Sequence, residues 1–325
     1  MKFLIIGFGS IGRQHLNSID RVCRPSIDKV SLLRRSEDKS LAVKQFTDTA
    51  EAQHWQPDIV IIASPASCHI AHFLAFEALP TTRAILIEKP LSASITELSR
   101  IACESKKAIV GFDMRQLSLM QKLKDLLNEP SLGSLLGVHV RVGQALPTWR
   151  KSNDFRLDVS ARKELGGGVV RELCHEFDYL RFLGFKFESV FAKLQKSDWL
   201  NLDVEDSAQV QADICLDDRL IPAFIELDML SEKAFRGCRL EFQNGRVVAD
   251  FIKSTIEIEE FGQRKISDRI EDPIPALDLQ LKELIKVAEQ GGIMKACDLE
   301  SGAAVMRIIH AVELSSECNI RVKVD

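Results

Sequence analysis

The sequence lacks the apolar runs that a membrane protein needs. No apolar run approaches the length of about 20 residues that a transmembrane helix requires. Hydrophobic residues at 46% and charged residues at 28% are instead typical of a soluble globular protein. A basic surplus, which usually marks a nucleic-acid-binding surface, is also missing, because the net charge is -4. We therefore expect neither a membrane nor a nucleic acid among the partners of this chain.

Cysteine pairs are missing as well. The eight cysteines are scattered, with no C-x-x-C pair, which argues against both a zinc site and a disulfide framework. A chain of 325 residues needs no covalent cross-links, so we expect reduced thiols, a cytoplasmic location and no metal. The apolar start, MKFLIIGFGSIG, is short and runs into glycines, so we interpret it as a first strand and not as a signal peptide.

The chain has two regions with different sequence patterns, and its length agrees with two domains. Up to residue 116, short apolar runs alternate with helical patterns, which predicts a parallel sheet with crossover helices. From residue 189 to 261 the chain is strand-like, and Asn244-Gly245 between two such runs predicts a hairpin. Helical patterns return at Leu277–Glu289 and Glu300–Ser316. We therefore predict an α/β domain over residues 1–116 and an α+β domain over residues 117–325.

Glycines at a fixed spacing follow the first predicted strand. Phe3–Ile6 runs into Gly7-Phe8-Gly9-Ser10-Ile11-Gly12, where a helical pattern begins. In this strand–turn–helix context the G-x-G-x-x-G spacing predicts a Rossmann dinucleotide site. Gly7 permits the turn, Gly9 lets the backbone approach a diphosphate, and Gly12 allows close helix–strand packing. The alternative is a glycine turn without a ligand.

The end of the second predicted strand bears on the choice between NAD and NADP. An NAD site usually has an acid there, which binds the ribose 2′-hydroxyl. Here Val30-Ser31-Leu32-Leu33 ends in Arg34-Arg35-Ser36. Guanidinium groups can pair with a 2′-phosphate, which favours NADP over NAD. The alternative is that both arginines are solvated at a surface turn.

Short polar motifs end the fourth and fifth predicted strands. The fourth leads to Ser64-Pro65 and the fifth to Glu88-Lys89-Pro90. In open α/β sheets, ligands bind outside the carboxyl ends of the strands, so Lys89 can face the crevice. A single lysine is more often a surface charge, so the other motifs of the chain decide between these interpretations.

A capping-box pattern, Ser94-Ile95-Thr96-Glu97, then predicts a helix over Ile95–Ser105.

The stretch GGGVVRELCHEFDYLRFLGF, residues 166–185, predicts a helix with two different sides. An apolar stripe at helical spacing consists of Leu173, Phe177, Leu180 and Leu183. Glu172, His175 and Asp178 recur every three residues and lie along one side of the predicted helix. These polar side chains face either water or a substrate.

Taken together, the motifs resemble those of the Gfo/Idh/MocA family, which is named for glucose–fructose oxidoreductase and inositol dehydrogenase. The resemblance spans essentially the whole chain and is carried by GFGSIG, ASPASCH, EKPLS, GFDMR and the triple-glycine helix. It implies an N-terminal Rossmann parallel-sheet domain and a C-terminal α+β domain with a large, mostly antiparallel open sheet. It also implies an NAD(P)-dependent dehydrogenase or reductase of sugars and cyclitols, and a homodimer or homotetramer formed through the C-terminal sheet.

The resemblance also assigns the candidate catalytic residues. Lys89 would bind and polarise the reacting hydroxyl or carbonyl, and His175 would be the general acid/base. This chemistry is sound, because hydride transfer to a carbonyl leaves an oxyanion that a cation stabilises and a histidine can protonate. The family has an aspartate four residues before the histidine, whereas here Glu172 precedes it by three. Glu172 either orients the imidazole or contacts the substrate.

Further candidates flank the cofactor and the substrate. We expect His69 near the cofactor and not in catalysis, whereas Asp178 either holds His175 or faces solvent. The candidate cofactor-binding residues are Gly7, Phe8, Gly9, Ser10, Ile11, Gly12, Arg34, Arg35, Ser36, Ser64, Pro65, His69, Glu88 and Lys89. The candidate substrate-binding residues are Asp113, Arg115, Trp149, Arg156, Arg162 and Asp178.

The polar stretch from Thr148 to Arg156, with Arg162 and Lys163 after it, bears on the substrate. Trp149 offers a face for a sugar ring, and the arginines can pair with a carboxylate or phosphate. We therefore expect a sugar with a negative group, such as a nucleotide sugar or an acidic sugar. The alternative is a solvated loop.

Three functions are compatible with these residues. The first is an NADP-dependent oxidoreductase of a sugar-like alcohol or carbonyl. The second is an enzyme that uses transient oxidation for a redox-neutral elimination or epimerisation. The third is a non-catalytic dinucleotide sensor, which would be expected to lack the lysine or the histidine. Both Lys89 and His175 are present, which favours an enzyme.

Overall fold

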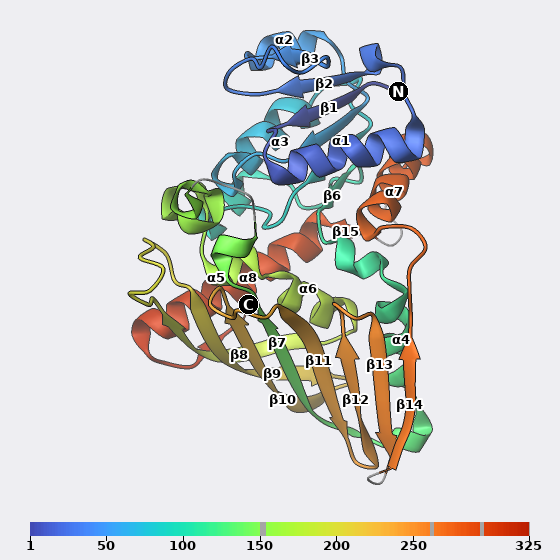
Figure 1. Ribbon diagram of the computed structural model, residues 1–325, viewed down its shortest axis with the longest axis vertical. Helices are drawn as coiled ribbons and strands as arrows, with labels where there is room; N and C mark the ends of the chain where they lie inside the picture. Colours follow the sequence, from blue (N-terminus) through green and yellow to red (C-terminus); the bar gives the residue numbers. More distant parts are fainter. Residues whose placement is uncertain (150–153, 261–262, 293–295, 325) are drawn as a thin grey trace. The chain divides into compact units, whose positions relative to one another are not determined.

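The computed structural model describes residues 1–149, 154–260, 263–292 and 296–324. Two compact units divide the chain (Figure 1). Unit 1 consists of Met1–Gln116, Glu164–Gly166 and Ile274–Met306. Unit 2 consists of Leu117–Lys163, Gly167–Pro273 and Arg307–Asp325. Within the described residues, no helix combines the length and the apolarity of a membrane-spanning segment.

Unit 1 contains a parallel sheet of the predicted Rossmann type. Its strands follow the order β15-β6-β5-β4-β1-β2-β3, with β15 antiparallel to β6 and the other pairs parallel. The bounds are β1 (Phe3–Ile6), β2 (Val30–Leu33), β3 (Lys44–Phe46), β4 (Ile59–Ile62), β5 (Ala84–Ile87), β6 (Ala108–Val110) and β15 (Cys297–Asp298). Strands β1, β2, β4 and β5 are buried at every residue, as their continuous apolar runs predict.

Helices cover this sheet and complete its core. They are α1 (Ser10–Cys23), α2 (Thr49–His54), α3 (His69–Glu77), α7 (Ala276–Gln290) and the first part of α8 (Leu299–Cys318). Leu281, Leu284 and Val287 of α7 pack in one buried cluster with strand residues such as Ile5. Residues 274–306, which the two-domain prediction placed in the second domain, therefore lie in unit 1. The composition of the sequence does not change where the chain returns to unit 1.

Unit 2 contains the large, mostly antiparallel sheet that the resemblance implied. Its order is β14-β13-β12-β11-β7-β10-β9-β8-β16. Strands β7 and β10 run parallel, and the other pairs that the structure describes are antiparallel. The bounds are β7 (Leu135–Gly143), β8 (Lys186–Gln195), β9 (Ser207–Leu216), β10 (Arg219–Asp228), β11 (Phe235–Phe242), β12 (Gly245–Asp250), β13 (Thr255–Glu260), β14 (Gln263–Arg269) and β16 (Val322–Lys323). The predicted fold class is thus confirmed in both units.

The hairpin predicted at Asn244-Gly245 is present, with a shifted turn. Phe242 pairs with Gly245, so Gln243 and Asn244 form the connection and Gly245 already belongs to β12. A Cβ on Gly245 would lie 2.1 Å from the carbonyl oxygen of Glu259. The glycine is therefore required by the neighbouring strand β13, whose main chain lies against it.

The sheet of unit 2 has one covered face and one open face. Burial alternates along β10, as period-two strands require. Helices α4 (Ser118–Leu126), α5 (Val169–Glu172) and α6 (His175–Phe182) contact strands of this sheet. Serine hydroxyls near the end of α8 accept hydrogen bonds from the amides of Ala192 and Leu194. The opposite face carries exposed side chains such as Leu220 and Phe224.

Candidate functional site

The glycine turn of unit 1 is shaped by close backbone contacts. Gly7 has a φ of 89°, and its amide donates to the carbonyl oxygen of Leu33 at 2.9 Å. A Cβ on Gly7 would lie 2.6 Å from the carbonyl oxygen of Ala63, and one on Gly12 would lie 2.4 Å from that of Gly7. A Cβ on Gly9 would meet no atom within 4 Å. Gly7 and Gly12 are therefore required by the fold, whereas the open space at Gly9 suits a ligand.

Helix α1 begins at this turn without a side-chain cap. Gly9 occupies the N-cap position and has no side chain that could accept a hydrogen bond from the first-turn amides. Such amides, together with the helix dipole, attract phosphate. The residues present therefore fit the diphosphate of a dinucleotide.

The tip of β2 carries an arginine that neighbouring side chains hold in place. The guanidinium of Arg34 donates to Oε1 of Gln45 at 3.2 Å and lies 3.7 Å from the carboxylate of Asp38. Phe8, in the glycine turn, has the guanidinium groups of Arg13 and Arg34 at 4.6 and 5.7 Å from its ring centroid. Arg34 is thus not simply solvated, whereas Arg35 and Ser36 are exposed.

An acid also lies near this tip, which the sequence alone did not place there. Hydrogen bonds from Ser40, and then the charge of Arg34, lower the pKa of Asp38. Asp38 therefore stays ionised next to the arginine. The loop after β2 holds both the cation that suits a 2′-phosphate and an anion that suits a ribose hydroxyl.

Lys89 follows β5 at the carboxyl edge of the sheet and is partly buried. The carboxylate of Glu88, before it, is buried and lies 2.7 Å from Nε2 of His15 in α1. Its other oxygen accepts from the amide of Lys89 at 3.3 Å. His15 was missed in the sequence, although it shares the buried side of α1 with Gly12 and Ile19 at helical spacing.

His69 joins two loops at the same edge. Its ring nitrogens contact the carbonyl oxygens of Pro90 and Ser64 at 2.9 and 2.8 Å. Burial lowers the pKa of His69, and the two carbonyls oppose that shift because both can accept a hydrogen bond only from the protonated ring. The imidazole thus connects the loop after β4 with the loop after β5. This geometry does not support the predicted contact of His69 with the cofactor.

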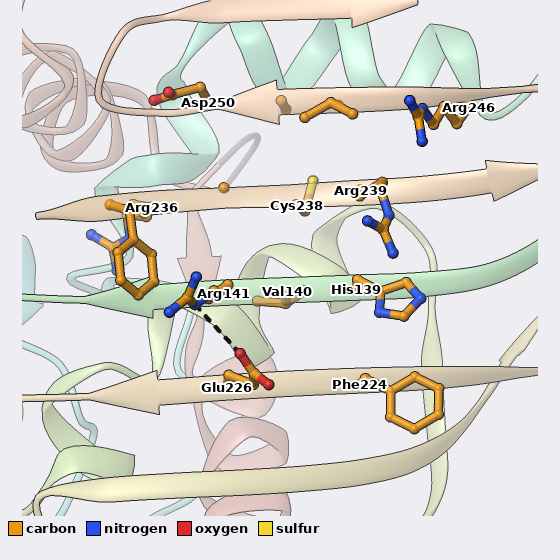
Figure 2. Close-up of a pocket in the computed structure, with 14 residues that line it drawn as sticks. His139, Val140, Arg141, Phe224, Glu226, Arg236, Cys238, Arg239, Arg246 and Asp250 are labelled. Carbon is orange, nitrogen blue, oxygen red and sulfur yellow. Dashed lines mark ion pairs between the residues drawn. The ribbon is translucent and has the colours of Figure 1, made fainter. Parts of the chain in front are cut away.

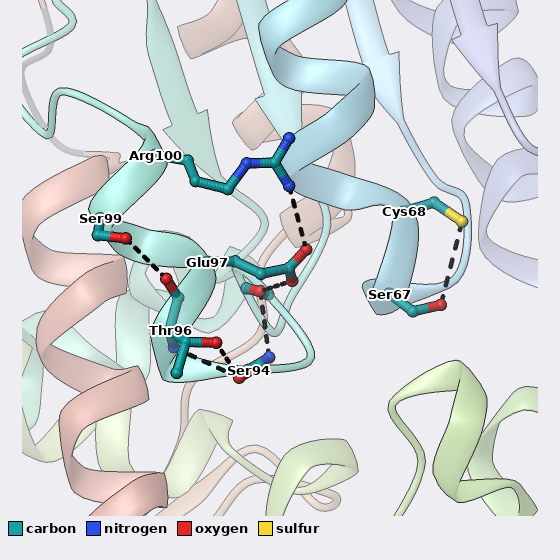
Figure 3. A network of polar contacts seen from close by, with 8 residues as sticks. Ser67, Cys68, Ser94, Thr96, Glu97, Ser99 and Arg100 are labelled. Carbon is teal, nitrogen blue, oxygen red and sulfur yellow. Dashed lines mark hydrogen bonds and ion pairs between the residues drawn. The ribbon is translucent and has the colours of Figure 1, made fainter.

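A network of small polar side chains follows the lysine (Figure 3). Ser92 donates to the carboxylate of Glu97, and its hydroxyl accepts from the amide of Ser94 at 3.2 Å. Ser94 caps the next turn by accepting from the amide of Thr96 at 3.3 Å. The helix predicted over Ile95–Ser105 is wrong in length and type, because only a 3-10 segment, Ile95–Arg100, forms. Glu97 bonds to Ser92 and not to the cap residue.

In unit 2 the last two glycines of the triple-glycine run pass close to other chain segments. A Cβ on Gly167 would lie 2.4 Å from the carbonyl oxygen of Val159. Gly168 has a φ of 118°, and its Cβ would lie 2.4 Å from the carboxylate of Glu205. Burial raises the pKa of Glu205, whose carboxylate accepts from the amide of Val170 at the start of α5. These glycines are explained by packing within the fold.

The helix predicted after the glycines is broken. Helix α5 ends at Glu172 and α6 begins at His175, because Leu173 leaves the helical conformation with φ -102° and ψ 33°. Glu172 and His175 therefore do not lie one turn apart on one helix, which corrects the predicted spacing. His175 is 9% exposed and Glu172 is partly buried. The apolar stripe is confirmed, since each of its four residues is buried.

A buried acid of α6 was not singled out in the sequence. Glu176 is 0% exposed and forms a two-pronged ion pair with Arg236 of β11, at 2.8 and 3.0 Å. Burial, with Glu176 as a second cause, raises the pKa of the neighbouring Cys238 to about 12. Asp178 is also 0% exposed, so the alternative that it faces solvent is wrong.

The candidate substrate residues are divided between the units. Asp113 and Arg115 lie in unit 1, in a 3-10 turn after β6, and the others lie in unit 2. Trp149 donates its ring N–H to the carbonyl oxygen of Gln144 at 2.9 Å.

The arginines of the polar stretch differ in their surroundings. Arg156 pairs with Asp154 at 3.3 Å, and Arg162 is partly buried. Residues 150–153 of this stretch lie outside the described residues. Within the described part of the chain, no group of three His, Cys, Asp or Glu side chains could hold a metal ion.

Family models match both units. Residues 1–113 match a model described as an oxidoreductase family with an NAD-binding Rossmann fold. Residues 120–214 match the model of the Gfo/Idh/MocA C-terminal domain.

Named relatives are similar over part of their length. Glucose-6-phosphate 3-dehydrogenase of Bacillus subtilis is 28% identical over 228 residues, which cover 65% of this chain and 61% of the relative. Myo-inositol 2-dehydrogenase of Thermotoga maritima is 28% identical over 205 residues, which cover 59% and 58%. The chain thus spans less than two thirds of these relatives. A solved structure of levoglucosan dehydrogenase with NADH and L-sorbose is 16% identical, covers 100% of this chain and 99% of its own, and has a TM-score of 0.82.

Replacement of Gly9 by alanine distinguishes a ligand-binding turn from a plain one. The added methyl meets no atom of the protein, so Gly9→Ala should cost no more than about 1 kcal/mol of unfolding free energy. The same methyl occupies the space for the diphosphate and should weaken NADH or NADPH binding by about tenfold or more. Calorimetric titration and thermal melting measure both effects.

Two glycine variants serve as controls for that experiment. Gly137→Ala, whose Cβ would lie 3.8 Å from its nearest neighbour, should change neither stability nor binding. Gly12→Ala should lower stability, since its Cβ would clash with the carbonyl oxygen of Gly7. Unchanged dinucleotide affinity in Gly9→Ala would contradict the assignment of this turn.

Proposed function

This chain belongs to the Gfo/Idh/MocA oxidoreductase family, and on that premise we propose that it is an NAD(P)-dependent dehydrogenase or reductase. The proposed reaction moves a hydride between the nicotinamide and a secondary alcohol or carbonyl of a sugar, a sugar nucleotide or a cyclitol. One observation carries the proposal. Unit 1 combines a glycine turn that fits a dinucleotide with a lysine on the carboxyl edge of the same sheet. A sensor protein has no need of that lysine.

The names of the relatives support the substrate class. One is a dehydrogenase of glucose 6-phosphate and another of myo-inositol. A phosphorylated sugar agrees with the expectation of a negative group, because Arg156 and Arg162 offer guanidinium groups beside Trp149 in sequence. We therefore propose a negatively charged sugar as the first class to be screened, with cyclitols as the second.

The chain's own residues have distinct roles in the proposed mechanism. When bound, the nicotinamide supplies the hydride acceptor or donor. The ammonium of Lys89 stabilises negative charge on the reacting oxygen, and His175 takes or returns the hydroxyl proton. Glu172 either orients the imidazole or contacts the substrate. The break between α5 and α6 supports a contact with the substrate. Because Glu172 ends one helix and His175 starts the next, the two residues lack the one-turn spacing by which Glu172 would orient the imidazole.

A redox-neutral elimination or epimerisation is the alternative use of the same residues. It needs the same transient oxidation, so the static geometry favours neither reaction. Absorbance of the reduced nicotinamide during turnover separates the two. A net change identifies a dehydrogenase, whereas product formed without a net change identifies the redox-neutral enzyme.

Removal of the proposed catalytic side chains should abolish most of the activity. Lys89→Ala and His175→Ala should each lower turnover by about 10²-fold or more, which is a usual loss for a positioned acid/base. Circular dichroism and NADH affinity verify that the fold is intact. Lys106→Ala and His310→Ala, which change exposed residues, are the matched controls. A double variant of Lys89 and His175 that remains active would remove the catalytic assignment.

The loop after β2 should favour NADPH over NADH. Arg35 is exposed next to Arg34, which a hydrogen bond to Gln45 holds in place. A charge-assisted hydrogen bond from Arg35 to the 2′-phosphate would contribute about 1.5–3 kcal/mol. Arg35→Ala should therefore raise the dissociation constant of NADPH by about tenfold or more and leave that of NADH unchanged. Arg24→Ala, at an exposed position of the same unit, is the control. Equal or tighter binding of NADH by the wild type contradicts the preference.

The open face of the unit 2 sheet is proposed to form a homodimer or homotetramer. Leu136, Leu220 and Phe224 are 51%, 65% and 43% exposed on β7 and β10. His139 and Phe224 line a hollow of about 610 Å³ together with residues of β11 and β12, and Figure 2 labels both side chains on their neighbouring strands. Their rings stack at 5.3 Å. Exposed apolar surface of this kind usually marks an interface.

Charge on this face should dissociate the oligomer. Leu220→Glu combined with Phe224→Glu should reduce the sedimenting species to a monomer, because two buried carboxylates cost several kcal/mol at an interface. Ile27→Glu, which changes a residue 60% exposed in unit 1, controls for added charge. A wild-type monomer at tens of micromolar, or a variant that still sediments as the oligomer, would refute the interface.

A further inference from the structure

Unit 1 buries a carboxylate and an imidazole that the proposed mechanism does not use. Glu88 is 7% exposed and His15 is 1% exposed. Oε1 of Glu88 lies 2.7 Å from Nε2 of His15. Removing a carboxylate from water costs several kcal/mol unless a partner offsets it. Because a carboxylate only accepts hydrogen bonds, Nε2 carries the hydrogen and His15 is the donor.

The second carboxylate oxygen of Glu88 reaches the residue that matters for the proposed reaction. Oε2 accepts from the amide of Lys89 at 3.3 Å. On its other side, a Cβ on Gly111 would lie 2.9 Å from Oε2. The carboxylate therefore fits between α1, the main chain of Lys89 and the residue after β6. A shift of this carboxylate would move the main chain from which the lysine side chain extends.

His15 reaches Glu88 from the helix that begins at the glycine turn. Gly12, His15 and Ile19 share the buried side of α1. The same helix offers its first-turn amides to a diphosphate. Helix α1 would thus serve both ends of the proposed cofactor site: its start offers uncapped amides that would suit the phosphates, and its buried histidine contacts Glu88 beside the lysine.

We propose that His15 is a positioning residue, which acts through Glu88 to fix the main chain of Lys89 and thereby the direction of the lysine side chain. This inference rests on the proposed function for its kinetic consequence. The simpler explanation is that His15 only offsets the cost of a buried carboxylate. The two explanations predict different kinetics for a variant that loses the hydrogen bond but keeps the fold.

Two substitutions of His15 separate the hydrogen bond from the bulk of the side chain. His15→Leu removes the donor, whereas His15→Gln keeps an amide donor near the position of Nε2. His15→Leu should lower kcat by about 10- to 100-fold, as small misplacement of a catalytic group does. KM and the NADPH dissociation constant should stay within about threefold, and His15→Gln should restore kcat to within about threefold of wild type. Ile19→Val, on the same buried side of α1, should lower stability without this loss of kcat.

A double-mutant cycle with Glu88→Gln tests the route of the effect. If His15 acts through Glu88, then His15→Leu should have no further effect on kcat in the Glu88→Gln background. Additive losses would overturn the proposal. Equal losses in His15→Leu and His15→Gln would also overturn it, and would leave His15 as a packing residue.

A chemical readout keeps this test independent of the proposed reaction. Acylation of Lys89 by an amine-reactive ester, detected by peptide mass spectrometry, reports the exposure and orientation of its amine. Its rate relative to exposed Lys106 should change by about threefold or more in His15→Leu and return in His15→Gln. An unchanged ratio overturns the inference. Absence of any turnover in the wild type overturns the proposed function instead, and leaves the labelling result to decide the role of His15.

Discussion

The contact of backbone with backbone at the carboxyl edge of the parallel sheet is the constraint on which the candidate site depends. There is no room for a Cβ between Gly7 and Ala63, or between Gly12 and Gly7. These contacts set the distance between β1, β4 and the start of α1, and therefore the depth of the turn that offers first-turn amides. Lys89 stands on the same edge because β5 is paired in register with β4. Main-chain geometry, and not side-chain chemistry, determines where the atoms of the candidate site lie.

Much of this architecture could be predicted from the sequence. Continuous apolar runs such as IVII leave a strand no exposed face, so a buried parallel sheet is expected. Alternation in β9 and β10 likewise requires a sheet with one covered face. The short β3 and β15 were missed because three- and two-residue strands carry no periodic signal. The return of α7 to unit 1 was missed because its amphipathic pattern does not reveal which apolar surface it covers.

The details of the candidate site were harder to predict, because they depend on which polar group is buried. Around His175 the sequence offers three acids within three residues, namely Glu172, Glu176 and Asp178. The structure buries Glu176 against Arg236, a partner 60 residues away along the chain. The break at Leu173 also depends on packing, since Val170 before it and Phe177 after it are both buried. At the tip of β2, the acid comes from Asp38, which a turn brings back to Arg34 through Gln45. A partner as distant along the chain as Arg236 leaves no local pattern around Glu176.

The two proposed catalytic residues are supported in different physical ways. Near Lys89, hydrogen bonds fix the main chain. Glu88 accepts from the amide of Lys89, and His69 contacts the carbonyl oxygen of Pro90. Such bonds constrain the main chain from which the lysine side chain extends. Near His175, burial does the holding, since the residues from Leu173 to Leu180 are all buried. A packed imidazole loses rotamer freedom on folding and not on binding, so its entropic cost does not count against the transition state.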